Sequence, residues 1–228
     1  MSEDAVYYHI RRTINGVTKR YLEKWAMESE CTGDTGLTWI MDCAKSYTDT
    51  GRTATLTGFS HLAGESVVVW SDDTGSIPGV DRSPDVAGVQ TTYAVDTGAG
   101  TVTLGTPVHH AVAGLPFQAD WKSTKLAYAA EIGTALAQTK RVPQSGLALY
   151  QTHNNALFYG SDTGNLNPLP RVVEGAVVDA DQIFDAIDID PFAFGGPWKT
   201  DSRLHLRAKA PRPATVLALV PTVTTSEK

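Results

Sequence analysis

The chain has 228 residues, 42% of them hydrophobic, and a formal net charge of −6 at pH 7. This suffices for one all-β domain or two small ones whose cores need no disulfide or metal. The negative charge argues against a generic nucleic-acid binder, which usually carries a basic face, but it does not exclude a channel through which DNA passes.

The N-terminal sequence MSEDAVYYHI is acidic and lacks the apolar segment of a signal peptide. No apolar run approaches the length of a transmembrane helix. The sequence therefore predicts a soluble protein made in the cytoplasm. Its two cysteines, Cys31 and Cys43, are close enough in sequence to close a small loop, but two reduced thiols are the simpler interpretation in that compartment.

Residues 7–25 predict a β-hairpin, because two alternating runs flank Asn15-Gly16. A lone hairpin is barely stable in water, so this one needs its own later strands or a neighbouring subunit to pack against. We expect an apolar face carrying Tyr8, Ile10, Ile14, Val17, Tyr21 and Trp25, and an opposite face carrying Arg12, Lys19 and Glu23.

The rest of the first half is typical of short strands joined by turns. Residues 37–47 fit a strand or a short helix, and residues 75–89, with three glycines and two prolines, predict an exposed loop. Strands are expected at 53–58 and 66–73, then a second hairpin that turns at 97–100, then an extended segment ending near residue 121.

The second half is also mainly β in pattern. An alanine-rich stretch, Leu126–Gln138, favours a helix by propensity, but its loose apolar spacing leaves this open. A strand–turn–strand is expected around 153–155, and residues 214–220, apolar on both faces, predict a buried strand. The fold class is therefore mostly β, with antiparallel sandwich or barrel-like units and few short helices, divided into 1–121 and 122–228.

No catalytic constellation is recognisable, so we expect neither an enzyme nor a cofactor. Adjacent His109 and His110 should point to opposite faces of a strand, which does not suit a single metal ion. Asp72 and Asp73 are interpreted as turn residues rather than a glycosidase pair. The five tryptophans are expected mainly in the core and in interfaces rather than in a sugar-binding groove.

The most acidic stretch lies between residues 174 and 190. Asp179, Asp181 and Asp185 loosely suggest a calcium loop, but the glycine of such a loop is missing and apolar residues interrupt it. We expect instead a solvated edge or a subunit contact, and no metal. The acidic residues proposed for this role are Asp179, Asp181, Asp185, Asp188 and Asp190.

Three phrases, INGVTKRYLEKWA, ATLTGFSHLAGESVVVWSDD and GLPFQADWKSTKL, resemble the C-terminal region of tail nozzle proteins of short-tailed bacteriophages, the tail-tubular-protein-B and tail-stabilisation-protein-like components. The resemblance extends from about Val6 to Thr225. Family members are usually longer, with a large β domain before the hairpin, and Leu126–Gln138 does not fit their pattern. The residues that carry the resemblance best are Leu56, Gly58, His61, Leu62, Gly64, Gly114, Leu115 and Pro116.

The resemblance implies a structural role in the virion tail, after assembly in the host cytoplasm and without a membrane. Such subunits form a ring, usually sixfold, which extends the DNA-ejection channel below the portal and adaptor and carries tail fibres or a tip. DNA would pass without sequence-specific binding, along a lumen that we expect the acidic residues to line. The alternative is a receptor- or carbohydrate-binding β module of a tail fibre or decoration protein, and a tail-borne hydrolase is a third reading.

Overall fold

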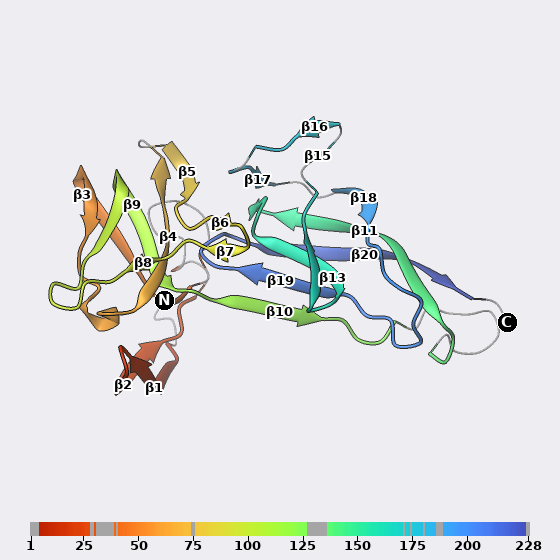
Figure 1. Cartoon of the computed structure of the whole chain (residues 1–228), viewed down its shortest axis with the longest axis horizontal. Coiled ribbons are helices and arrows are strands. Elements are labelled where there is room, and N and C mark those ends of the chain that lie inside the picture. Colours follow the sequence, from red (N-terminus) through yellow and green to blue (C-terminus); the bar gives the residue numbers. More distant parts are fainter. Residues whose placement is uncertain are drawn as a thin grey trace. The chain divides into compact units, whose positions relative to one another are not determined.

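A computed structural model describes residues 5–27, 30, 39, 41–73, 76–126, 136–170, 172–173, 175–179, 181–185 and 189–226. The chain divides into two compact units, Met1–Phe117 and Gln118–Lys228 (Figure 1). The predicted boundary after residue 121 would cut strand β10 (Gln118–Lys122), which belongs to the second unit. Within the described ranges the elements are strands and one 3-10 helix, η3 (Ser60–Leu62), which confirms the mostly-β prediction.

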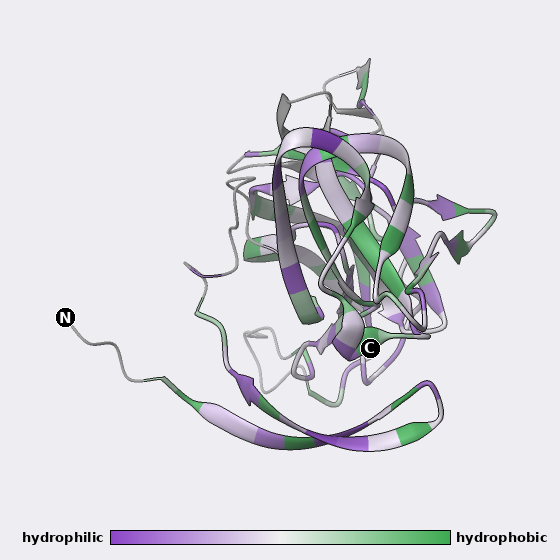
Figure 2. Ribbon diagram, turned by 90° about the vertical axis from the view of Figure 1, so that its left-hand side faces the viewer, coloured by the Kyte–Doolittle hydropathy of each residue, from purple (hydrophilic) through white to green (hydrophobic). Residues whose placement is uncertain are grey.

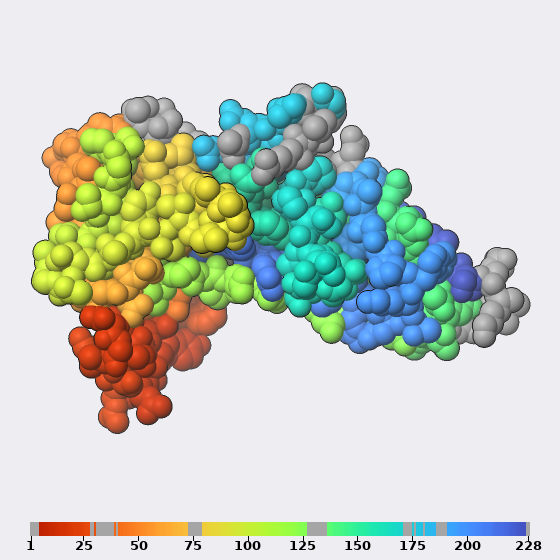
Figure 3. Space-filling view, in the orientation of Figure 1, coloured from red at the N-terminus to blue at the C-terminus, as the bar shows by residue number. Residues whose placement is uncertain are grey.

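The N-terminal hairpin forms as predicted from β1 (Tyr7–Ile14) and β2 (Val17–Lys24). Asn15 and Gly16 have φ angles of 48° and 74°, and positive φ at both central residues is what the favoured two-residue hairpin turn requires. Hydrophilic and hydrophobic residues alternate along both strands (Figure 2), and the hairpin projects from the rest of its unit (red in Figure 3).

The predicted division of hairpin faces is wrong. The register pairs Tyr8 with Glu23, Ile10 with Tyr21 and Arg12 with Lys19. Because side chains alternate with a period of two, all six lie on one face. This face, which we call the inner face, includes Ile14, which is buried in the core of the first unit. The outer face carries Tyr7, His9, Arg11, Thr13, Thr18, Arg20, Leu22 and Lys24.

The main sheet of the first unit is antiparallel, in the order β3-β9-β4-β5. Its strands β3 and β9 are long, and β8 also pairs with β4. A small separate pair is formed by β6 and β7. The bounds are β3 (Asp42–Leu56), β4 (Ser66–Asp73), β5 (Ser76–Asp81), β6 (Asp85–Val86), β7 (Val89–Gln90), β8 (Tyr93–Ala94) and β9 (Val102–Leu115).

Two loop predictions for this unit have different outcomes. The exposed loop expected at 75–89 is wrong, since it contains β5, β6 and β7. Its proline, Pro78, is accommodated because β5 is an edge strand, where a missing N–H costs no ladder bond. The turn expected at 97–100 is confirmed: Val95 and Val102 form an antiparallel bridge across it. Of the stretch 37–47, residues 42–47 are strand, and residues 37, 38 and 40 lie outside the described ranges.

The second unit packs two antiparallel sheets around one core. One has the order β10-β19-β13-β14 and the other β18-β11-β20. Leu147 and Leu149 of β11 share a buried cluster with Leu157 of β13 and Leu206 of β19, as expected for a sandwich. The bounds are β11 (Lys140–Tyr150), β13 (Leu157–Asp162), β14 (Asn165–Pro168), β18 (Ile189–Ala193), β19 (His205–Lys209) and β20 (Thr215–Thr225). Two further pairs are β12 (Thr152–His153) with β17 (Ile183–Phe184) and β15 (Val172–Val173) with β16 (Ala176–Val177).

The strand expected at 214–220 forms, but it is not buried. Leu217 and Val220 are 59% and 67% exposed. The reason is its position: β20 is an outer strand of its sheet and, among the strands that the structure describes, pairs only with β11. The strand–turn–strand around 153–155 is confirmed, since β12 and β13 flank it. The alanine-rich stretch lies largely outside the described residues, so the helix there stays a prediction.

Candidate functional site

The hairpin is attached to its unit by polar contacts on its inner face. The Asn15 backbone N–H donates to a carboxylate oxygen of Glu65 at 2.6 Å, and the Tyr21 hydroxyl donates to the carbonyl of His61 at 3.3 Å. Both acceptors lie in the segment between β3 and β4. We call this contact region the hairpin junction, and its members are Arg12, Asn15, Tyr21 and Glu23 of the hairpin with Asp42, Cys43, His61 and Glu65 of the body.

Arg12 is the central cation of the hairpin junction. Its guanidinium donates to both carboxylate oxygens of Glu23, at 2.5 and 2.7 Å, and to both of Asp42, at 2.7 and 2.8 Å. Bidentate pairs of this kind combine charge with a fixed geometry. Because Glu23 belongs to the hairpin and Asp42 begins β3, the same side chain stiffens the hairpin and fastens it to the main sheet.

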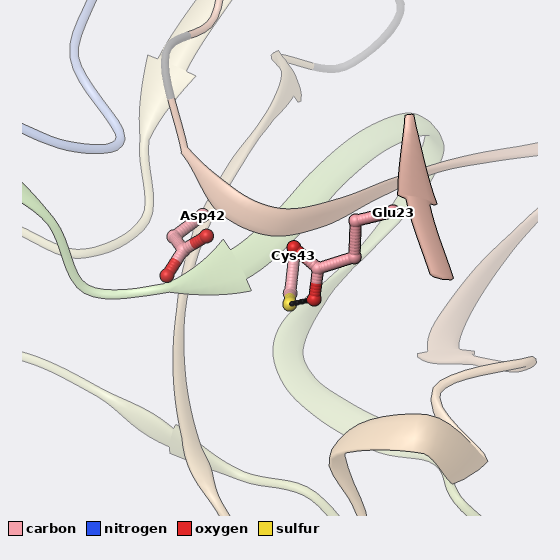
Figure 4. Close-up of side chains that lie close together, drawn as sticks. All are labelled: Glu23, Asp42 and Cys43. Carbon is pink, nitrogen blue, oxygen red and sulfur yellow. Dashed lines mark hydrogen bonds between the residues drawn. The ribbon is translucent and has the colours of Figure 1, made fainter. Parts of the chain in front are cut away.

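Glu23, Asp42 and Cys43 form the group within the described residues whose potential ligand atoms all lie within 4.8 Å of one another (Figure 4). The Cys43 thiol lies 3.3 Å from a carboxylate oxygen of Glu23, to which it donates. Burial, followed by this hydrogen bond, raises the pKa of Cys43 to about 12.

The chemistry of this group favours a structural role over metal binding. A metal ion would have to displace the guanidinium of Arg12, which already donates to both oxygens of Glu23 and of Asp42. Hydrogen bonds from Arg12 lower the pKa of Glu23, against the opposing effect of burial, so that this carboxylate is charged and already paired. Among the described residues Cys43 forms no disulfide, and Cys31 lies outside them, so the expected reduced state of both thiols stays a prediction.

The residues that carry the resemblance to tail nozzle proteins lie at the hairpin junction or beside it. Leu56 and Leu62 are buried in the core beneath it, and the His61 ring nitrogen Nε2 lies 3.3 Å from the carbonyl oxygen of Cys43. Gly58 has positive φ and faces the Lys45 side chain. At the end of β9, Gly114 has no room for a side chain against Asp42 and Ala44, Leu115 pairs with Asp42, and Pro116 follows exposed.

Replacing Gly64 by alanine should loosen the hairpin. Gly64 has a φ of +85°, and a Cβ atom there would lie 2.6 Å from Cγ of Asn15. We expect a loss of about 1–2 kcal/mol from the left-handed backbone, plus the cost of displacing the turn. Gly88→Ala is the matched control, because Gly88 has a φ of +82° and open space around it. Urea unfolding measures the loss of stability, and the rate of tryptic cleavage after Arg11 and Arg20 measures the loosening of the hairpin. Equal stability and equal cleavage rates in Gly64→Ala and Gly88→Ala would contradict this prediction.

A second polar cluster surrounds the fully buried Asp72. One oxygen of this carboxylate accepts the backbone N–H groups of His109 and His110, at 3.0 and 3.1 Å, and the other lies 3.7 Å from the guanidinium of Arg52. The interpretation of Asp72 as a turn residue is therefore wrong, because it belongs to β4 and anchors β9. The two histidine rings lie 6.2 Å apart, centroid to centroid, on β9.

The acidic stretch does not form a calcium loop in the described residues. Exposed Asp179, Asp181 and Asp185 flank β17, and Asp181 lies 3.4 Å from Nε2 of the buried His153. The backbone carbonyl of Asp179, a potential cation ligand, instead accepts hydrogen bonds from Asn154 and Gln182. Asp188 lies outside the described residues, and of Asp190 only the backbone, in β18, is described. Whether these residues face a lumen stays a prediction.

The sequence analysis missed Arg12 and Asp72 as organising residues. The position of Arg12 was predictable from strand alternation. Ile10, Arg12 and Ile14 are two positions apart, so their side chains lie on the same, buried side of the hairpin. For Asp72 the signal was its continuity with the β-branched run of β4.

No protein-family model and no curated protein matches the chain. None of the described segments is a helix long and apolar enough to cross a membrane.

Proposed function

We propose that this chain is a structural protein of a phage tail: a ring subunit that extends the DNA-ejection channel and serves as an attachment platform. The observation that carries the proposal is the position of the phage-like motif. Its phrase Leu56–Glu65 connects β3 to β4 and contributes His61 and Glu65 to the hairpin junction. The residues on which the resemblance to nozzle proteins rests thus hold a projecting element, as a subunit that reaches toward a neighbour requires.

The two all-β units are consistent with a scaffold role. Their buried clusters each contain eleven or more hydrophobic residues. The partners proposed are further copies of the chain, the portal or adaptor, and tail fibre or tip proteins. The proposed location is the virion tail. We propose no catalytic activity and no cofactor.

The particle mass in solution tests this function. We expect the purified chain, alone or with portal and adaptor of the same particle, to form a closed oligomer of about six copies, since a head-to-tail contact that closes gives a ring. Light scattering after size exclusion measures the mass at several concentrations. A strict monomer that stays monomeric with both neighbours would contradict the proposal.

The alternative is a receptor- or carbohydrate-binding module. Trp121 and Trp198 of the second unit are about half exposed, whereas Trp39 and Trp70 of the first unit are buried against each other. Exposed indole rings are the usual platforms for sugars in such modules. A glycan screen of the wild type and of Trp121→Ala and Trp198→Ala distinguishes the two functions: specific binding by a monomer, lost in either variant, would favour the module.

A further inference from the structure

The outer face of the hairpin is basic and fully accessible. Its eight residues are all exposed, and they include Arg11 and Arg20 but no aspartate or glutamate. Residues 7–24 together contain five basic residues and one acidic residue, in a chain whose net charge is −6. The hairpin is therefore a cationic element on an otherwise acidic protein.

Arg11 and Arg20 are direct cross-strand partners. Like charges placed opposite each other in an antiparallel pair are destabilising, and an anionic group that lies against both relieves this repulsion. No ion pair joins either side chain to a carboxylate within the part of the chain that the structure describes. Arg12, by contrast, lies on the inner face and pairs with two carboxylates, those of Glu23 and Asp42.

The same face also carries apolar surface. Leu22 is 73% exposed and Tyr7 is 59% exposed. Among the described strands, β1 and β2 pair only with each other, so the ribbon presents both of its long edges as well as its outer face. A phosphate backbone would use the arginines but not Leu22, whereas a protein surface that offers carboxylates beside apolar side chains would use both.

A second copy of this chain offers such a surface. Asp179 and Asp185 are exposed, and half-buried apolar residues adjoin them: Val178 precedes Asp179 and packs against the core of the second unit, and Ile183 precedes Asp185 by two positions. Opposite charges across an interface steer association and fix its register. Because the basic and acidic surfaces are different parts of one chain, a contact between them is compatible with a head-to-tail interface, the type that forms a ring where the rotation closes.

We propose that the outer face of the β1–β2 hairpin docks onto the acidic segment 179–185 of a second copy of this chain, with Arg11 and Arg20 placed against Asp179 and Asp185. This inference rests on the proposed ring assembly and assigns its subunit contact. The proposed contact also explains the role of the hairpin junction, because Arg12 fixes the hairpin from its inner face while the outer face docks.

Charge reversal and its complement test the contact. Sedimentation velocity at low and high salt compares the wild type with Arg11→Glu/Arg20→Glu and with Asp179→Lys/Asp185→Lys. We expect each double variant to weaken self-association by about tenfold or more, and a mixture of the two to associate again. Arg141→Glu/Lys199→Glu, which changes two exposed basic residues of the second unit, is the control for net charge and should assemble as the wild type does. Circular dichroism checks that every variant is folded.

The outcomes separate this contact from the function itself. If the wild type forms a closed oligomer and both reversal variants form it equally well, the contact is overturned while the ring remains. If the wild type is monomeric under all conditions, the ring and the contact both fail.

Binding of a labelled DNA duplex, measured by fluorescence anisotropy, tests the competing partner. If Arg11→Glu/Arg20→Glu loses DNA binding while its self-association is unchanged, the outer face binds DNA and the proposal is overturned.

Discussion

Replacing Asp72 by alanine is expected to lower the free energy of unfolding of the first unit by about 3–5 kcal/mol, the range found when one partner of a buried charged group is removed. The change leaves the N–H groups of His109 and His110 without their acceptor in a buried site, and each unsatisfied group costs about 1–3 kcal/mol. It also removes the carboxylate that faces Arg52. Urea unfolding followed by tryptophan fluorescence measures the loss, because Trp70 is buried in the neighbouring part of β4.

Two further variants sharpen this experiment. Asp72→Asn keeps the shape and one acceptor oxygen but not the charge, so we expect a smaller loss. Asp96→Ala also removes an oxygen that accepts two backbone N–H groups, those of Gly98 and Ala99, but in an exposed turn where water replaces it. Its expected cost is about 1 kcal/mol. A cost for Asp72→Ala no larger than that for Asp96→Ala would contradict the role of burial.

Replacing Arg12 by methionine should detach the hairpin and cost about 2–3 kcal/mol, the upper range for hydrogen bonds to charged groups. The variant leaves Glu23 and Asp42 facing each other without their shared cation. Tryptic cleavage after Arg11 and Arg20 should become faster, and urea unfolding should begin at lower concentration. Lys19→Met is the control, since Lys19 is the exposed cross-strand partner of Arg12; equal losses in both variants would contradict the assignment.

The same ion pair predicts a dependence on pH. Arg12 lowers the pKa of Glu23 in the folded protein below its ordinary value of 4.5. A carboxyl group whose pKa is lower when folded stabilises the fold above its unfolded-state pKa, and this contribution is lost as the pH falls through the folded-state pKa. The difference in stability between wild type and Arg12→Met should therefore be largest above the ordinary pKa of 4.5 and shrink as the pH falls below it.

Local signals in the sequence were enough to predict much of the fold. Asn15-Gly16 predicts the hairpin turn from the backbone conformation that glycine and asparagine tolerate, and the β-branched run at 66–73 predicts β4. The burial of a strand is different, because it depends on which strands lie beside it. The run at 214–220 is apolar enough for a central strand, but sheet order places it at an edge.

The hairpin junction was only partly predictable for the same reason. The phrase around Gly58 and Gly64 marks a place where the backbone needs unusual conformations. Nothing in local sequence indicates that Asp42 meets Arg12, thirty positions earlier, or that Asp72 reaches the N–H groups of β9. Such contacts depend on strand register across long separations.

Four of the six outer strands of the main sheets share one feature. Prolines lie in β5, β14, β18 and β20, at Pro78, Pro168, Pro191 and Pro221, whereas the outer strands β3 and β10 carry none. Two further prolines, Pro107 and Pro143, lie in the inner strands β9 and β11. A proline interrupts the row of N–H donors by which one edge would recruit another. Copies of this chain are thereby hindered from pairing through the backbones of these four strands. At these edges, contact between copies is left to side chains, which can select one partner and one geometry.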